Sequence, residues 1–138
     1  MIYAGVTADE NGAFAIVYGR SESVHYEAFK PEEFKAAMDN YNAMDVRCVV
    51  EMPGDGIIET PEKINPATFA RMYCRKRGIP FMFVKHGTVR REYGMKEEQT
   101  MKQECKLRYP GIELRGEEQE QEEAAKAVLL AKYARRYL

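Results

Sequence analysis

Two polar residues stand where predicted β-strands end, and they are the first candidates for chemistry. Thr7 ends a strand predicted over Ile2–Thr7, and Glu51 ends the buried run Val46–Glu51. In an open α/β sheet, functional groups collect at the carboxyl ends of neighbouring strands. Carboxylates there suit hard divalent cations, and two such ions about 4 Å apart support hydrolysis of a phosphodiester. Taken alone, Glu51 is more simply explained as a strand-end acid that pairs with a nearby Lys or Arg.

The elements that position these residues are predicted from hydrophobic pattern and from turn chemistry. The strands are expected at Ile2–Thr7, Gly12–Gly19, Val24–Phe29, Val46–Glu51 and Ile79–Val84. Helices are expected from Pro31 onward, at Pro66–Arg77, at Lys96–Arg108 and at Glu118–Tyr137, with a short turn or helix at 88–93. In the second helix, Phe69, Met72 and Tyr73 are expected on the buried face.

This order, β-β-β-α-β-α-β-α-α, predicts an α/β fold. A hairpin meander that feeds two β-α crossovers gives a mixed five-stranded sheet flanked by helices on both faces. No repeat or linker divides the chain, so residues 1–138 are expected to form a single domain.

Composition is typical of a globular domain with a charged surface. Of the 138 residues, 45% are apolar and 31% are charged. No apolar run approaches the roughly 20 residues that span a membrane, and no signal peptide opens the chain. We therefore expect a cytoplasmic protein outside the membrane. Cys48, Cys74 and Cys105 are widely spaced, which predicts buried thiols and not a zinc site.

Positive charge is concentrated in one part of the chain. Residues 71–115 carry 12 Lys or Arg against 5 acids, a net +7, whereas the remaining residues carry 9 against 17, a net −8. A basic segment of this kind is compatible with a nucleic-acid surface, although the whole chain has a net charge of −1. Solvated faces of ordinary helices explain the same count equally well.

Several motifs follow one another along the chain. The segment Gly5–Ala13 aligns with G-[IV]-D-P-G-x-x-G-A, and Val49–Glu51 aligns with V-[IV]-E. A basic turn ending at Gly94 comes next, and a helix that carries Lys102 follows it. Glu123–Tyr133 matches the apolar half of a D-x-x-A-D-A-L-L-[LI]-A-x-Y helix. In this order and spacing, the chain resembles the RuvC-type Holliday-junction resolvases of the RNase H-like superfamily, particularly their short phage and bacterial forms.

The resemblance implies a catalytic site of four metal-binding acids, of which this chain keeps two. Glu51 matches the second acid and Glu123 matches the third, with Glu122 as an alternative. Thr7 replaces the first aspartate, and Lys126 replaces the remaining acid of the final helix. The formal charge of the four positions changes from about −4 to about −1, which weakens the binding of Mg²⁺ or Mn²⁺.

Two residues offer compensation for the lost acids. Asp9 lies two positions beyond the strand end and could face the site, although an ordinary turn aspartate is the simpler interpretation. The ammonium of Lys126 could replace the missing cation beside Glu51 and Glu123. An exposed i, i+4 ion pair between Lys126 and Glu122 explains the same lysine equally well.

The resemblance also implies partners. In the family, the region from the second to the third helix includes DNA-facing surface, and the family works as homodimers on branched DNA. Phosphate contacts are therefore expected from the cations of this region, namely Arg75, Lys76, Arg77, Lys85, Arg90, Arg91, Lys96 and Lys102.

Three functions are compatible with these features. The preferred one is a resolvase-like protein that binds branched or double-stranded DNA and has lost or weak nuclease activity. The alternative is an active Mg²⁺- or Mn²⁺-dependent junction endonuclease that uses Glu51, Glu123 and Asp9. The third is a structural or interaction protein that binds no nucleic acid. Thr7 and Lys126 argue against the second function, and the basic segment argues against the third.

Overall fold

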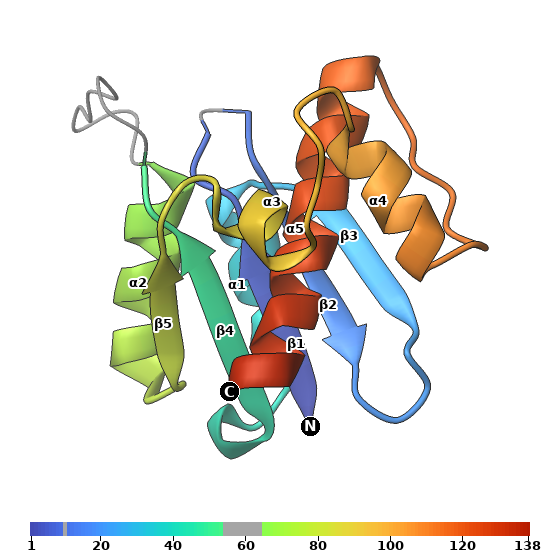
Figure 1. The fold of residues 1–138 in the computed structure, drawn as a ribbon. Helices are drawn as coiled ribbons and strands as arrows, with labels where there is room; N and C mark the ends of the chain where they lie inside the picture. Colours follow the sequence, from blue (N-terminus) through green and yellow to red (C-terminus); the bar gives the residue numbers. More distant parts are fainter. Residues whose placement is uncertain (10, 54–64) are drawn as a thin grey trace.

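One five-stranded sheet organises the protein (Figure 1). The computed structural model describes residues 1–9, 11–53 and 65–138. The strands are β1 Ile2–Val6, β2 Ala13–Tyr18, β3 Val24–Ala28, β4 Val46–Glu51 and β5 Phe81–Val84. The helices are α1 Pro31–Met38, α2 Pro66–Arg77, α3 Thr88–Glu92, α4 Met101–Arg108 and α5 Glu118–Tyr137, with a 3-10 turn at Ala43–Asp45. The sequence predicts a loop from Met52 to Pro61, between the fourth strand and the second helix, and its residues 54–61 lie outside the described residues.

The strand order β3-β2-β1-β4-β5 confirms the predicted mixed sheet. The first three strands form an antiparallel meander, whereas β4 pairs in parallel with β1 and β5 pairs in parallel with β4. Crossovers through α1 and α2 make the parallel pairings possible. As a result, the carboxyl ends of β1, β4 and β5 all lie at the same end of the sheet.

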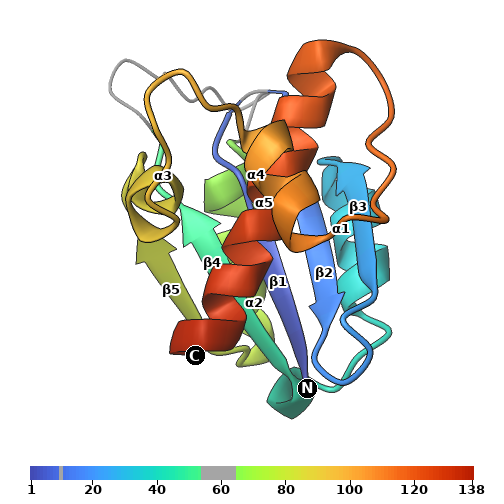
Figure 2. The ribbon, with the colours of Figure 1, turned by 45° about the vertical axis from the view of Figure 1, so that its right-hand side comes forward.

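Helices cover both faces of this sheet (Figures 1 and 2). On one face, α1 and α2 pack against the sheet through a core that includes Phe14 and Phe34, whose rings meet edge to face at 5.3 Å. On the other face, α3, α4 and α5 enclose a second core that contains Val49, Val128 and Leu129. Burial of these side chains is the main stabilising term for the two layers.

Helix α5 lies directly on β1 at a glycine. A Cβ atom added to Gly5 would stand 2.3 Å from the Ala127 carbonyl oxygen and 2.5 Å from the Ala131 nitrogen. Both neighbours are backbone atoms, so a larger residue could be accommodated only if α5 moved away from the sheet. This close contact sets the height of Lys126, the residue before Ala127, above the end of β1.

Two expectations about the helices were wrong. The third long helix begins at Met101 and not at Lys96, because Thr100 is its N-cap and forms a capping box with Gln103. Met72 is 57% exposed and does not lie on the buried face of α2. That helix contacts the core through small residues such as Ala70, which turns Met72 toward solvent.

The three cysteines are buried free thiols, as predicted. Among the helices of the described residues, none has the length and apolar character that crossing a membrane requires.

Candidate functional site

Three elements bring sequence-predicted site residues together at one end of the sheet, where β1 and β4 finish. Thr7 follows β1, Glu51 ends β4, and Lys126 lies on α5. Because Val6 pairs with Val50 in parallel register, the residues that follow them in the two strands are close neighbours. The relative exposures of Thr7, Glu51 and Lys126 are 0%, 2% and 6%, so the site is built from buried polar groups.

The ammonium of Lys126 is the centre of this site. Its Nζ lies 3.1 Å from Glu51 Oε1, 3.2 Å from Asp9 Oδ2 and 3.5 Å from Glu123 Oε1. Three carboxylates therefore converge on one cation that belongs to the chain itself. The alternative of an exposed pair between Lys126 and Glu122 is wrong, because the lysine is buried and contacts these other acids. The ammonium of Lys126 thus occupies the point on which the three carboxylates converge.

Glu122, the alternative to Glu123 at the site, has a different environment. Its two carboxylate oxygens accept hydrogen bonds from the backbone N–H groups of Met101 and Lys102 at 3.0 and 2.9 Å. These groups open α4, where a carboxylate satisfies free donors and complements the helix dipole. Glu122 therefore fastens α4 to α5, and Glu123 is the acid that faces Lys126.

The Thr7 hydroxyl is engaged in hydrogen bonding between the end of β1 and the start of β2. Its Oγ1 accepts a hydrogen bond from the backbone N–H of Ala13 at 2.9 Å, and its own backbone N–H donates to the Ala13 carbonyl at 3.0 Å. The hydroxyl thus closes the hairpin and brings no negative charge to the site.

Glu51 makes two further contacts from the strand end. Its Oε1 accepts a hydrogen bond from the Ala8 backbone N–H at 3.4 Å, and its Oε2 lies 3.9 Å from His86 Nδ1. A cavity of 210 Å³ adjoins these groups and is lined by His86, Glu123 and Lys126 among others. His86 was absent from the residues predicted for the site, although its place two residues after β5, at the same end of the sheet as Glu51, could have indicated it.

Asn65 is a second residue that the sequence interpretation missed. It is 6% exposed, and its side chain donates to the Ala8 carbonyl at 2.6 Å while accepting from the Ala67 N–H at 2.8 Å. It is therefore both the N-cap of α2 and a link from that helix to the segment after β1. The signal was present, because an asparagine directly before Pro66 is a common helix start.

The electrostatics of the site follow from burial and from its mixed charges. Burial raises the pKa of Glu123 to about 7, and the interaction with Asp9 acts in the same direction. The pKa of Asp9 is lowered, first by its hydrogen bond with Glu123 and also by Lys126. Burial alone would lower the pKa of Lys126, but the surrounding charges of Glu51, Glu123 and Asp9 outweigh it and raise the pKa. The lysine is therefore cationic at neutral pH.

These residues do not fit a divalent metal centre. Lys126 Nζ is within 3.5 Å of all three nearby carboxylates, so it stands where a cation would have to bind, and its charge would repel one. Within the described part of the chain, no three His, Cys, Asp or Glu side chains are arranged to hold a metal ion. Thr7 adds to the misfit, because its hydroxyl is a poorer ligand for Mg²⁺ than a carboxylate.

The fold places six of the eight predicted DNA-contacting cations in two separate groups. Lys85 follows β5, and Arg90 and Arg91 lie on α3, so all three are near the end of the sheet that carries Glu51. The run Arg75–Arg77 forms the last turn of α2, next to the start of β5 and therefore at the opposite end of the sheet. A continuous basic segment in the sequence is not a continuous surface in the fold.

Three of these cations already have partners within the protein. The Arg77 guanidinium donates to the carbonyl oxygens of Met38 and Tyr41, and Arg90 donates to the carbonyl oxygens of Lys96 and Gln99. Lys102 pairs with Glu118 at 3.2 Å. The others are exposed and make no side-chain hydrogen bond or ion pair with any described residue, namely Arg75, Lys76, Lys85, Arg91 and Lys96.

The sheet order and the helix layers are those of an RNase H-like fold of the RuvC type. Two solved structures show the similarity over nearly the whole chain. Thermus thermophilus RuvC superposes with a TM-score of 0.58 at 13% sequence identity, covering 99% of this chain and 96% of that one. RuvC of T. thermophilus in complex with a Holliday junction substrate gives a TM-score of 0.53 at 16% identity, with the same coverage. No family model and no curated protein matches the sequence.

Proposed function

We propose that this protein binds branched or double-stranded DNA in the manner of a junction resolvase and lacks metal-dependent cleavage. The observation that carries the second half of the proposal is the contact of one buried ammonium, Lys126 Nζ, with three carboxylates. A nuclease of this kind needs cations that coordinate the scissile phosphate and an attacking water. A lysine buried among the acids offsets part of their negative charge and occupies the position where a metal ion would have to bind.

The DNA-binding half of the proposal is supported by the fold and by exposed cations. One structure that superposes on this chain is described as RuvC with a Holliday junction substrate. In this protein, Lys85, Arg91 and Lys96 are exposed, and Lys85 and Arg91 lie near the end of the sheet that carries Glu51. Three phosphate contacts would give a slope of log affinity against log salt of about −3. Two copies acting together would match the symmetry of a four-way junction, and a homodimer is part of the proposal.

The test is a titration of a fluorescent four-way junction and of its linear duplex arms, with and without Mg²⁺ or Mn²⁺. We expect salt-sensitive binding that is the same with either ion and with EDTA, and no cut product on a denaturing gel. Glu51→Ala is run in parallel, because any cleavage that it abolishes belongs to this site.

The outcomes distinguish the three candidate functions. Cleavage that needs metal and is lost in Glu51→Ala would establish an active endonuclease that uses Glu51, Glu123 and Asp9. Absence of binding at low salt would leave a structural or interaction protein that has no nucleic-acid partner. As a positive control, restoring acids by Thr7→Asp combined with Lys126→Asp should allow Mn²⁺ to bind, since two further carboxylates would then join those of Glu51, Glu123 and Asp9 without an ammonium.

A further inference from the structure

A groove of 480 Å³ lies between β5, α3 and the last turns of α5, and we call it the β5 groove. Strand β5 is an edge strand, because it pairs with β4 only and no other strand of the described residues lies against it (Figures 1 and 2). The volume of the groove is in the range of sites that take small molecules, about 300–1,000 Å³. Its lining includes Met82, Lys85, Arg91, Glu92 and Tyr133.

The polar side of the β5 groove carries positive charge that has no partner within the described part of the chain. Lys85 and Arg91 are exposed, and neither forms a side-chain hydrogen bond or ion pair with any described residue. Glu92 is the one acid among the described residues that line the groove. Its carboxylate accepts a hydrogen bond from the Tyr137 hydroxyl and pairs with the Arg136 guanidinium, both at 2.9 Å. Two unpaired cations beside a neutralised acid suit a phosphate-bearing ligand.

The apolar side of the β5 groove is formed by Met82 and Tyr133, which are both half-buried. The ring of Tyr137 packs against that of Tyr133, with the ring centroids 4.5 Å apart. The contacts of Glu92 with Tyr137 and Arg136 join α3 to the end of α5 and hold this aromatic pair in place. An aromatic side chain beside unpaired cations is the combination on which single-stranded nucleic acid binds, with bases on the rings and phosphates on the cations.

The β5 groove begins at the end of the sheet that carries Glu51. Val84 pairs with Glu51 in parallel register, so Lys85 lies directly beyond that pair. Tyr133 lies about two turns after Lys126 on α5, or about 10 Å further along the helix axis. A nucleic-acid strand that leaves the Glu51 end can therefore pass Lys85 with a phosphate and reach Tyr133 with a base.

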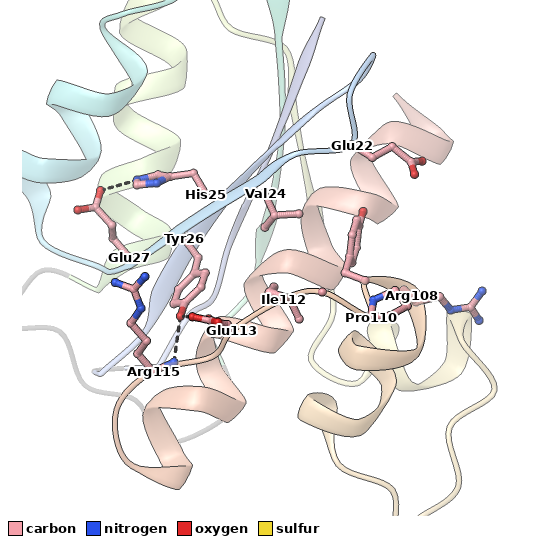
Figure 3. A pocket seen from close by; sticks show the side chains of 12 residues that line it. Glu22, Val24, His25, Tyr26, Glu27, Arg108, Pro110, Ile112, Glu113 and Arg115 are labelled. Carbon is pink, nitrogen blue, oxygen red and sulfur yellow. Dashed lines mark hydrogen bonds and ion pairs between the residues drawn. The ribbon is translucent and has the colours of Figure 1, made fainter.

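A larger groove of 860 Å³, between β3 and the segment that follows α4, has a different character (Figure 3). Three acids and two arginines are among the residues that line it, namely Glu22, Glu27, Glu113, Arg108 and Arg115. The hydroxyl of Tyr26 donates to the Glu113 carbonyl at 2.6 Å and accepts from the Arg115 N–H at 2.9 Å. Its acids repel a polyanion, and its tyrosine is already engaged, so this groove serves as the comparison for the β5 groove.

We propose that the β5 groove holds an unpaired segment of a DNA strand, with phosphates on Lys85 and Arg91 and a base on Tyr133. Duplex DNA covers the faces of its bases, so an aromatic side chain can stack on a base only where the strand is unpaired. The inference rests on the proposed function, since the branched DNA supplies the strand. It adds a preference within that class, namely for branched DNA with one single-stranded arm over branched DNA with four paired arms.

The test compares two four-way junctions by fluorescence anisotropy with the full chain. One junction has four paired arms, and in the other a single strand of thymidines replaces one arm. We expect the second junction to bind more tightly. Tyr133→Leu removes the ring and should weaken that binding between about 5-fold and 150-fold, while affinity for the fully paired junction changes by less than about 2-fold. Tyr133→Phe keeps the ring and should bind both junctions as the wild type does.

Tyr26→Leu is the matched control, because it makes the same change in the groove of Figure 3, and both junctions should bind to it as to the wild type. Circular dichroism checks that each variant is folded. Photo-crosslinking of the wild-type protein gives a readout that does not depend on any variant. With 5-iododeoxyuridine in the single-stranded arm, we expect crosslinks to the peptides that contain Met82 or Tyr133.

The outcomes separate this inference from the proposed function. Equal affinity of the wild type for the two junctions overturns the inference and leaves junction binding intact. An equal loss at both junctions in Tyr133→Leu, or crosslinks found only outside the β5 groove, also overturns it. Failure to bind the fully paired junction overturns the proposed function, whereas binding of the single-stranded arm that depends on the Tyr133 ring still supports the groove. Failure to bind either junction overturns both.

Discussion

Lys126 holds together three acids that would otherwise repel one another. Removing one partner from a buried ion cluster leaves uncompensated charge, which costs about 3–5 kcal/mol. We therefore expect Lys126→Met to lower the free energy of unfolding by that amount in urea denaturation. Lys132→Met is the control, because Lys132 lies on the same helix, its ammonium stands 5.5 Å from the centroid of the Tyr109 ring, and it forms no ion pair with any described residue. Its loss should cost about 1 kcal/mol or less.

The same variant should acquire affinity for a divalent ion. Without the ammonium, the carboxylates of Glu51, Asp9 and Glu123 can offer oxygens to Mn²⁺. A ligand that binds only the folded state, at 100 times its Kd, stabilises it by about 2.7 kcal/mol. We expect the Tm of Lys126→Met to rise with Mn²⁺ while the Tm of the wild type stays constant. An equal rise in both proteins would show that the lysine does not block the site.

Glu123 should make stability depend on pH over a defined range. Its pKa of about 7 in the folded protein exceeds the ordinary value of 4.5. The folded state thus binds the proton more tightly, so the stabilisation is complete below pH 4.5 and is lost as the pH rises to 7. The loss is up to about 3 kcal/mol.

Urea denaturation at intervals from about pH 4.5 to about pH 7.5 measures this dependence. Glu123→Gln should remove it, because an amide does not titrate. Glu98→Gln, at an exposed position, should leave the slope as it is in the wild type. A wild-type profile that superposes on that of Glu123→Gln would contradict the raised pKa.

At the scale of elements, the seat of α5 on β1 is the feature that aligns the site. Gly5→Ala would place a methyl group against the Ala127 carbonyl and push the helix outward. Overpacking of this kind costs about 1–3 kcal/mol, and we expect that loss of stability in thermal or urea unfolding. Gly111→Ala is the matched control, since nothing lies within 4 Å of an added Cβ there. Equal stability of the two variants would show that α5 is free to shift.

Much of this architecture could be predicted from pattern. Val46–Glu51 has the composition of a buried strand, and parallel pairing of two strand ends then placed Glu51 near Thr7. The destination of Lys126 could not be read from helical periodicity, because a lysine on an alanine-rich helix is compatible with either solvent or a buried ion cluster. The acids that Lys126 meets depend on how α5 packs against the sheet, including its close approach to Gly5, a residue distant in the sequence. Met72 shows the same limit, since apolar spacing does not say which side of α2 is covered.

At the scale of the molecule, DNA binding should depend on the end of the sheet that carries Glu51. Reversing charge at Lys85 and Arg91 removes exposed cations near Glu51, so Lys85→Glu combined with Arg91→Glu should weaken junction binding. Each lost phosphate contact also lowers the salt slope by about 1. Fluorescence anisotropy at several salt concentrations measures both quantities.

The control for this prediction makes the same change in net charge at the opposite end of the sheet. Arg75→Glu combined with Lys76→Glu alters the last turn of α2, and we expect at most a small effect on affinity. If the Arg75→Glu, Lys76→Glu variant loses as much affinity as the Lys85→Glu, Arg91→Glu variant, DNA does not bind preferentially around Glu51. The basic segment could not have separated the two groups, because charge counted along a sequence ignores the reversal of direction between α2 and β5.

The covalent attachment of Lys126 has one more consequence. A metal ion can be chelated, diluted or exchanged, whereas an ammonium on a side chain is present in every folded molecule in the same proportion. The positive charge of Lys126 at this end of the sheet is therefore fixed when the chain is made and does not follow the supply of Mg²⁺ or Mn²⁺. Under the proposed function, DNA bound there would be released uncut, and its residence time would be set by the dissociation rate and the surrounding salt.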